Sequence, residues 1–142
     1  MIEVVPFKAA HLAAIKLQDA QVSVSEWVTE SMGVALEEHN SYTGFYEGNP
    51  IGAAGIIHQW PGRSLAWAFI GDAGPSVFIQ IHHAVKRFLD GCYVKRLEMT
   101  VDCEFPEGHR WAKLLGFKME CERMRQYTPD GRDNALYVRI LQ

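Results

Sequence analysis

Apolar residues recur at helical spacing in the middle of the chain. Val77, Ile81 and Phe88 fall on one face of a helix, because residues three and four apart are neighbours on a helical surface. A loop rich in Gly and Pro at 71–76 precedes this stripe. The pattern predicts an amphipathic helix over residues 76–91, ending at a glycine.

A second region of helical spacing lies near the N-terminus. Residues 8–21 are rich in helix formers, and residues 23–26 read Ser-Val-Ser-Glu, the spacing of a capping box at a helix start. We therefore predict two consecutive helices. The apolar residues at helical spacing in the second are Val24, Trp27, Val28, Met32, Ala35 and Leu36.

Alternation of apolar and polar residues marks the strands, most clearly at 94–102. There Leu97, Met99 and Val101 share one face and Glu98 lies on the other. Runs of β-forming residues between turn residues predict the remaining strands. These strands cover 2–7, a hairpin at 41–60 with its turn at 47–50, 63–70, 117–127 and 134–141, and a short helix is predicted at 106–116.

The predicted elements follow the order β-α-α-β-β-β-α-β-α-β-β. This order predicts an α/β (α+β) layered domain with a mixed, mostly antiparallel central sheet. The segment from 63 to 102 is the exception, because a helical crossover of this kind joins parallel strands. The 142 residues contain no linker or repeat, so we expect 1–142 to be a single domain.

Composition narrows the classes of function. A formal net charge of -3 argues against a general nucleic-acid binder, and no apolar run is long enough to span a membrane. Three widely spaced cysteines fit neither a disulfide framework nor a zinc pattern. His82 and His83 are neighbours on a predicted helix and point about 100° apart, so we predict no metal site. Without a signal peptide, we expect a cytoplasmic protein.

The stretch GHRWAKLLGFKME at 108–120 predicts a short helix that stops at Gly116 and turns directly into a strand. With the strand RLEMTVD at 96–102 and the order of elements, it resembles the GNAT family of acetyl-CoA-dependent N-acyltransferases. The resemblance covers essentially the whole chain and implies a single three-layer GNAT-like acyltransferase domain. The chain is also similar to small GNAT-like proteins of tailed phages.

The resemblance implies that acetyl-CoA is the co-substrate. In the family, the acyl donor lies where two parallel strands splay apart, with its pyrophosphate on a loop at a helix N-terminus. Asp72 would place a negative charge at this loop, and Pro75 removes one N–H donor. The residues implied for coenzyme A binding are Phe69, Ile70, Gly71, Ala73, Gly74 and Ser76.

The resemblance also locates the acid that protonates the leaving thiolate. The family usually has a tyrosine four residues before the glycine of Leu-Gly-Phe, and this chain has Ala112 there. His109 at the start of the same helix and Tyr127 near the end of the following strand are substitute donors. For His109, the alternative is an ordinary solvent-facing residue.

Glu98 is the candidate general base that would activate the amine. It lies on the polar face of the 94–102 strand, where a carboxylate is either a base with a raised pKa or the partner of a basic residue. Arg96 and Arg123 are the candidate partners.

Two functions follow, and the sequence leaves open whether the chain is an enzyme. The first is acyl transfer from acetyl-CoA to an amine of unknown identity. The alternative is a catalytically silent GNAT-like phage protein that acts in virion assembly through protein contacts. The partners would be the amine, a second copy in a homodimer, or phage structural proteins in a bacterial host, with no nucleic acid and no membrane.

Overall fold

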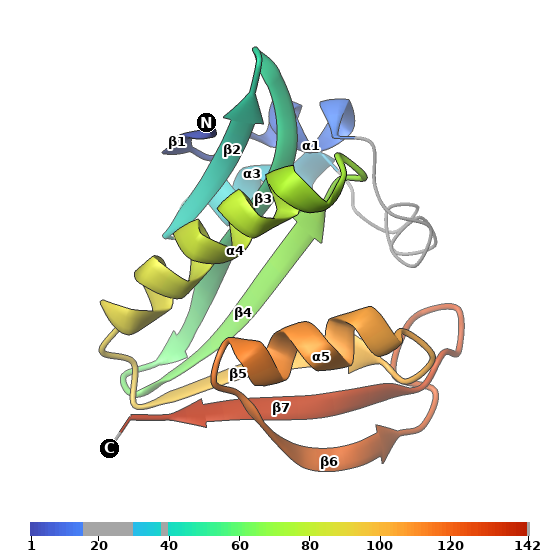
Figure 1. Ribbon diagram of the computed structural model, residues 1–142. Helices are drawn as coiled ribbons and strands as arrows, with labels where there is room; N and C mark the ends of the chain where they lie inside the picture. The colour runs from blue at the N-terminus through green and yellow to red at the C-terminus, as the bar shows by residue number, and fades with distance from the viewer. Residues whose placement is uncertain (16–29, 38–39, 142) are drawn as a thin grey trace. The chain divides into compact units, whose positions relative to one another are not determined.

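A computed structural model describes residues 1–15, 30–37 and 40–141 (Figure 1). The predicted capping box at 23–26 and the start of the second predicted helix lie outside these residues. In chain order the elements are β1 Glu3–Pro6, α1 Ala9–Ala14, α3 Glu30–Glu37, β2 Ser41–Tyr46, β3 Asn49–Trp60, β4 Arg63–Ile70, α4 Pro75–Asp90, β5 Arg96–Asp102, α5 Pro106–Leu114, β6 Lys118–Met124 and β7 Asn134–Ile140.

The seven strands form one sheet in the order β1-β2-β3-β4-β5-β7-β6. Strands β4 and β5 run parallel, whereas β1 and β2, β2 and β3, β5 and β7, and β6 and β7 are antiparallel. The predicted mixed, mostly antiparallel sheet is therefore confirmed, as is the parallel pairing across 63–102. The sequence did not show that β7 lies between β5 and β6.

The chain divides into two compact units. Unit 1 comprises 1–57 and 67–91, and unit 2 comprises 58–66 and 92–142, so β4 contributes its first residues to unit 2 and its last to unit 1. The single domain predicted from the sequence stays a prediction.

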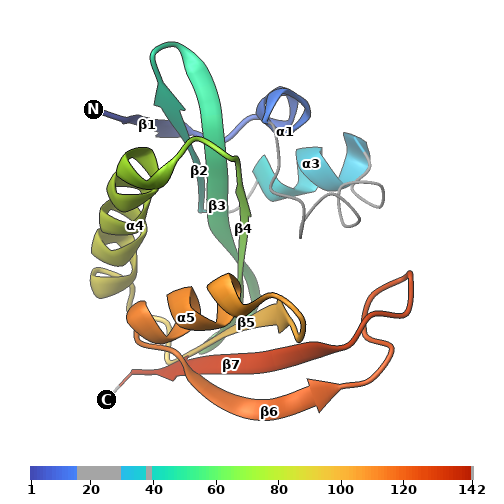
Figure 2. The same ribbon diagram turned by 45° about the vertical axis from the view of Figure 1, so that its right-hand side comes forward.

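Unit 1 is layered, with α4 on one side of its strands and α1 and α3 on the other (Figure 2). The α4 helix buries Val77 and Ile81, which confirms the apolar stripe predicted for it. On the opposite side, the buried residues Phe7, Ile15 and Ala53 form a core cluster. The partly buried side chains packed against that cluster are Leu12, Leu36 and Trp67.

In unit 2, α5 lies along β5 and β7 (Figure 2). Ala112 of α5 and Tyr137 of β7 are each 0% exposed, and Leu97 of β5 is 2% exposed. Leu97 belongs to the apolar face that alternation in the sequence predicted for β5, and Tyr137 pairs with Met99 of that face. An apolar core between one helix and one sheet face therefore fixes α5.

The end of α5 explains the Leu-Gly-Phe of the sequence. Gly116 has φ 92°, a left-handed conformation that glycine adopts without steric cost. Its N–H donates to the Lys113 carbonyl at 3.1 Å, and the Phe117 N–H donates to the Ala112 carbonyl at 3.0 Å. This pair of bonds is the Schellman motif, and the buried Phe117 and Ala112 supply its usual apolar contact.

We predict that Gly55→Ala destabilises the protein by about 1–3 kcal/mol or more. A Cβ at Gly55 would lie 2.6 Å from the Asn40 carbonyl oxygen and 2.7 Å from the Ser41 Cβ, so backbone would have to move. Urea unfolding measures the effect. The control is Gly44→Ala on the neighbouring strand, where the nearest atom to the new Cβ is 3.9 Å away. Equal stability of both variants would contradict the steric argument.

Candidate functional site

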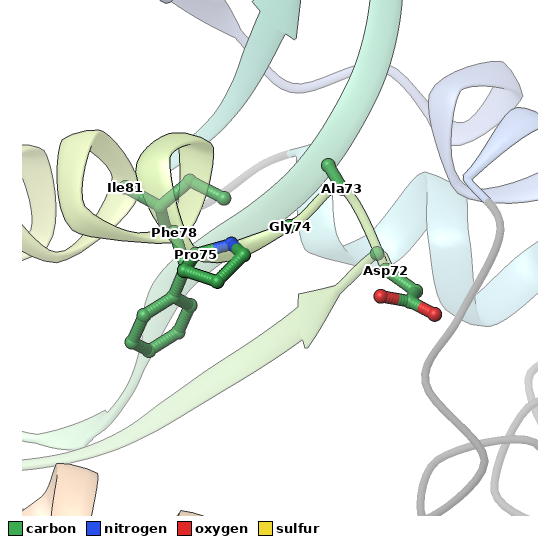
Figure 3. Close-up of a pocket in the computed structure, with 7 residues that line it drawn as sticks. Asp72, Ala73, Gly74, Pro75, Phe78 and Ile81 are labelled. Carbon is green, nitrogen blue, oxygen red and sulfur yellow. The ribbon is translucent and has the colours of Figure 1, made fainter.

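The first candidate site is the loop between β4 and α4 in unit 1. The Gly71 N–H donates to the Ile51 carbonyl at 2.7 Å, which ties the end of β4 to β3. Gly74 then caps α4 with φ 88°, and its carbonyl accepts the first helical hydrogen bond from the Phe78 N–H at 3.0 Å. A pocket of about 260 Å³ lies at this turn (Figure 3), and its lining residues are Gly71, Asp72, Ala73, Gly74, Pro75, Phe78 and Ile81.

The pocket presents the positive end of α4. The first N–H groups of a helix have no partner within it, so the start of α4 is a candidate place for an anion. Pro75 at the first helical position has no N–H, and this costs no bond that the helix would otherwise make. A Cβ built on Gly74 meets nothing within 4 Å, so the backbone there is open to close approach.

The structure corrects one detail of the predicted phosphate loop and retains another. Gly71 was expected to bring its backbone close to a phosphate, but it is buried and its N–H is already bonded to Ile51. Asp72 lines the pocket, so its negative charge lies beside the expected anion, although its exposed carboxylate points away from Pro75 and Phe78 in Figure 3. The remaining binding capacity therefore lies at Gly74 and the first turn of α4.

The six predicted cofactor residues divide into three sets. Gly71, Ala73 and Gly74 line the pocket. Phe69 and Ile70 are buried at 9% and 4% exposure. Ser76 is exposed at the first turn of α4. The lining residues that sequence reasoning missed, Phe78 and Ile81, follow Gly74 at helical spacing, and that spacing could have identified them.

The second candidate site is the charged network around Glu98 in unit 2. Arg63 donates from Nε to Glu98 Oε2 at 2.6 Å and from Nη2 to Oε1 at 3.0 Å, and Arg96 Nε donates to Oε2 at 2.8 Å. Arg96 also holds Glu120 through both terminal nitrogens, at 3.0 and 2.5 Å. Hydrogen bonds from Arg63 and then Arg96 lower the pKa of the nearly buried Glu98 from 4.5 to about 2.

Of the two alternatives for Glu98, this geometry supports the ion pair. A carboxylate with such a low pKa is ionised at neutral pH and is a weak base, so its role as catalytic base stays a prediction without support. Arg96 is a correct candidate partner. Arg123 is a wrong one, since it donates to Asp133 at 2.6 Å. Sequence reasoning missed Arg63, which the parallel register places beside Arg96.

His109 is held between β7 and the end of β5. Its Nδ1 lies 2.7 Å from the Tyr137 hydroxyl, and its Nε2 lies 3.1 Å from the Asp102 carbonyl oxygen. A carbonyl only accepts hydrogen bonds, so Nε2 carries the proton, and in the neutral ring Nδ1 accepts from the Tyr137 O–H. Burial raises the pKa of Tyr137, which keeps it a donor. His109 therefore ties α5 to β7 and to the end of β5, and it is not a residue that contacts only solvent.

The predicted catalytic residues are not brought together within unit 2. Glu98 lies on the sheet face opposite Leu97, whereas His109 lies on the α5 face with Tyr137. Tyr127 lies beyond the end of β6 and is 52% exposed. The roles assigned to His109 and Tyr127 stay predictions.

The described parts of the chain lack two further kinds of feature. No group of three or more His, Cys, Asp or Glu side chains there could hold a metal ion. None of the helices in 1–15, 30–37 and 40–141 is long and apolar enough to cross a membrane.

Comparison by sequence finds no match for this chain, whereas comparison by structure does. No protein-family model matches the sequence. No curated protein matches it significantly either. Solved structures do match. Ard1 from Thermoplasma volcanium superposes with a TM-score of 0.78 at 16% identity, covering 99% of this chain and 98% of that one.

Two further acetyltransferase structures cover the chain almost completely. An N-acetyltransferase from Staphylococcus aureus Mu50 gives a TM-score of 0.74 at 12% identity, over 99% of this chain and 97% of that one. The Salmonella typhimurium protein yncA, solved with its cofactor acetyl-CoA, gives 0.73 at 12% identity, over 100% of this chain and 95% of that one. The predicted GNAT fold is therefore confirmed.

We predict that Glu98→Gln lowers the free energy of unfolding by roughly 2–3 kcal/mol at pH 7, measured by urea denaturation. The folded pKa of about 2 lies below the ordinary 4.5, so the stabilisation is complete above pH 4.5 and is lost as pH falls towards 2. The difference between the two proteins should shrink over that window. The control is Glu120→Gln, whose pair with Arg96 is exposed to solvent and should therefore contribute much less than that of Glu98. If the difference in unfolding free energy between the unmodified protein and Glu98→Gln did not change with pH, the low pKa assigned to Glu98 would be wrong.

We also predict that Tyr137→Phe lowers the free energy of unfolding by about 1–2 kcal/mol, because His109 Nδ1 loses its buried donor. The ring of the variant fills the same space, so thermal and urea unfolding report the hydrogen bond alone. The exposed Tyr127→Phe is the control and should be neutral. Stability unchanged in Tyr137→Phe would show that the His109 contact is not a hydrogen bond.

Proposed function

We propose that the chain is a GNAT-type N-acyltransferase that transfers an acyl group from a coenzyme A thioester such as acetyl-CoA to an amine. The observation that carries the proposal is the open pocket at the N-terminus of α4, on a fold shared with acetyltransferases. The fold alone would leave the activity unspecified. The pocket adds an anion site suited to the pyrophosphate of coenzyme A.

Groups at the start of α4 would hold the thioester. The N–H groups of Ser76 and Val77 and the dipole of α4 would bind the phosphates, and the Ser76 hydroxyl would add a further donor. Gly74 leaves room for close backbone approach. Bound in this way, the thioester supplies an activated acyl carbon for attack by a neutral amine.

Proton transfer is where this chain departs from the usual pattern. Ala112 can donate no proton, and the Tyr137 hydroxyl is enclosed and bonded to His109. We therefore propose that the substrate amine itself supplies the proton that the leaving thiolate takes. When the C–N bond forms, the nitrogen becomes positively charged, and its proton passes to the sulfur as the C–S bond breaks. The products are the amide and the free thiol.

The alternative is a catalytically silent GNAT-like protein that works through contacts. Its specific support is that the residues around the expected acid are used internally: Ala112 fills the core beneath α5, and both nitrogens of His109 are bonded. A phage origin, a role in virion assembly, a homodimer and a cytoplasmic location stay predictions of the sequence. Binding of the thioester separates the two functions.

We predict that Ser76→Glu abolishes binding of acetyl-CoA and coenzyme A, measured by isothermal titration calorimetry. The new carboxylate would occupy the positive end of α4 and repel phosphate, while an acidic residue in the first turn would stabilise the helix. The variant should therefore keep or gain thermal stability. The matched control is His83→Glu, on the same helix face two turns later and roughly 10 Å along the axis.

The possible results of this titration lead to different conclusions. Binding by the unmodified protein and His83→Glu, but not by Ser76→Glu, supports both the function and the site. Equal binding by all three proteins would place the phosphates elsewhere. Absence of heat with the unmodified protein at millimolar ligand would overturn the acyltransferase proposal and favour the silent alternative.

A further inference from the structure

The pocket at the start of α4 has an unusual charge for a site that would hold phosphate. Its lining residues in the described part of the chain include one carboxylate, that of Asp72, and no lysine or arginine. Phosphate sites often combine backbone N–H groups with a basic side chain, because a phosphate is strongly anionic. Among these lining residues the charged side chain is negative, so the pocket tolerates fewer negative charges on its ligand than a basic pocket would.

The Asp72 carboxylate keeps its charge because no partner neutralises it. Asp72 is exposed, and none of the ion pairs or side-chain hydrogen bonds found within 1–15, 30–37 and 40–141 involves its carboxylate. By contrast, the charge of Glu98 is offset by a paired arginine. The Asp72 carboxylate therefore acts on an anion that binds beside it, with the salt in the solvent as the main source of screening.

Apolar residues form the other side of the pocket. In Figure 3, Pro75 and Phe78 lie on one side of Gly74, and Asp72 lies on the other. Ile81 also lines the pocket and is buried, so this side belongs to the apolar stripe of α4. A ligand bound across Gly74 thus meets an apolar surface beside its phosphate, together with a charge that repels the phosphate.

The pantetheine arm of an acyl thioester has groups that match this pocket. Its phosphate is attached through a CH₂ group to a carbon with two methyl groups, so a phosphate at the start of α4 would bring these methyls towards Pro75 and Phe78. Coenzyme A carries the same arm with two more phosphates, one in the diphosphate and one on the ribose. Asp72 repels each further charge, and for unit charges about 4 Å apart in water this repulsion lowers affinity about fivefold.

We infer that Asp72 selects the acyl donor by its charge: the preferred donor is a pantetheine thioester with a single phosphate, and acetyl-CoA is a weaker one. This inference rests on the acyltransferase function proposed above and specifies the class of its donor. The same arm occurs free, as 4′-phosphopantetheine, and attached to a carrier protein through a phosphodiester. Both sources present the thioester, the methyl groups and one phosphate.

The test is calorimetric titration with four acetyl thioesters that carry from zero to three phosphates: S-acetylpantetheine, S-acetyl-4′-phosphopantetheine, acetyl-dephospho-CoA and acetyl-CoA. For the unmodified protein we expect S-acetyl-4′-phosphopantetheine to bind most tightly. S-acetylpantetheine should bind more weakly, because it lacks the phosphate that the start of α4 favours. Acetyl-dephospho-CoA should bind about threefold to tenfold more tightly than acetyl-CoA, which differs from it by one phosphate.

Two variants isolate the charge of Asp72. Asp72→Asn keeps the size of the side chain, and we expect it to strengthen binding of acetyl-CoA about fivefold, of S-acetyl-4′-phosphopantetheine by less, and of S-acetylpantetheine not at all. The gain should shrink in about 1 M salt. Asp90→Asn makes the same change of charge at the last residue of α4, about 22 Å from its first residue along the axis, and should leave all four affinities unchanged. Because Asp72 is exposed, Asp72→Asn should unfold at the same temperature as the unmodified protein.

Tighter binding of acetyl-CoA than of S-acetyl-4′-phosphopantetheine to the unmodified protein would overturn the donor class and leave the coenzyme site standing. An equal gain for all four ligands in Asp72→Asn, no gain for any of them, or an equal gain in Asp90→Asn would show that Asp72 does not act on the phosphates, and would overturn the inference as well. Failure of all four ligands to bind would instead overturn the proposed function. If the inference holds, an acetylated carrier protein that binds more tightly than the free arm identifies the carrier as the donor, and equal or weaker binding identifies the free thioester.

Discussion

The parallel junction of β4 and β5 depends on one carboxylate. Its register pairs Arg63 with Arg96, so two guanidinium groups lie on adjacent strands. Glu98 lies between them and accepts from both, with side-chain exposure of only 9%. Without it, two like charges would face each other in a partly desolvated place. The parallel pairing of β4 and β5 in a mostly antiparallel sheet is thus built around Glu98.

That structural role conflicts with a catalytic one. A general base works best with a pKa near the pH at which it operates, and the two arginines hold the pKa of Glu98 far below that range. The charge that secures the strands is therefore unavailable for proton abstraction. A perturbed pKa here indicates an ion-pair network in the fold, which is the other common cause of such shifts.

Two helix ends show how similar backbone chemistry serves structure or binding. At the end of α5, Gly116 allows the carbonyls of Ala112 and Lys113 to accept hydrogen bonds, so the turn is complete and apolar. At the start of α4, Gly74 has no capping side chain, and an open pocket lies beside this end of the helix. Both positions need positive φ, but only the second leaves bonds to be made by a ligand.

Local signals predicted the fold well, and long-range contacts limited prediction of the site. The strand at 63–70 and the helix ending at Gly116 follow from alternation and from glycine chemistry, which neighbouring residues determine. The Arg63–Glu98 pair joins residues 35 apart, and only the strand register reveals it. Tyr137 looked like an ordinary strand residue, because nothing local shows that α5 places His109 above it.

If acyl transfer occurs on this scaffold, positioning has to supply most of the rate. Glu98 and His109 are engaged in internal bonds, and Ala112 is inert. Aminolysis of a thioester needs little acid catalysis when the nitrogen carries the proton that the thiolate takes. Holding two reactants in line can replace a bimolecular step with an effective molarity of about 10⁵–10⁸ M. A phosphate anchor at the start of α4 would contribute to such alignment.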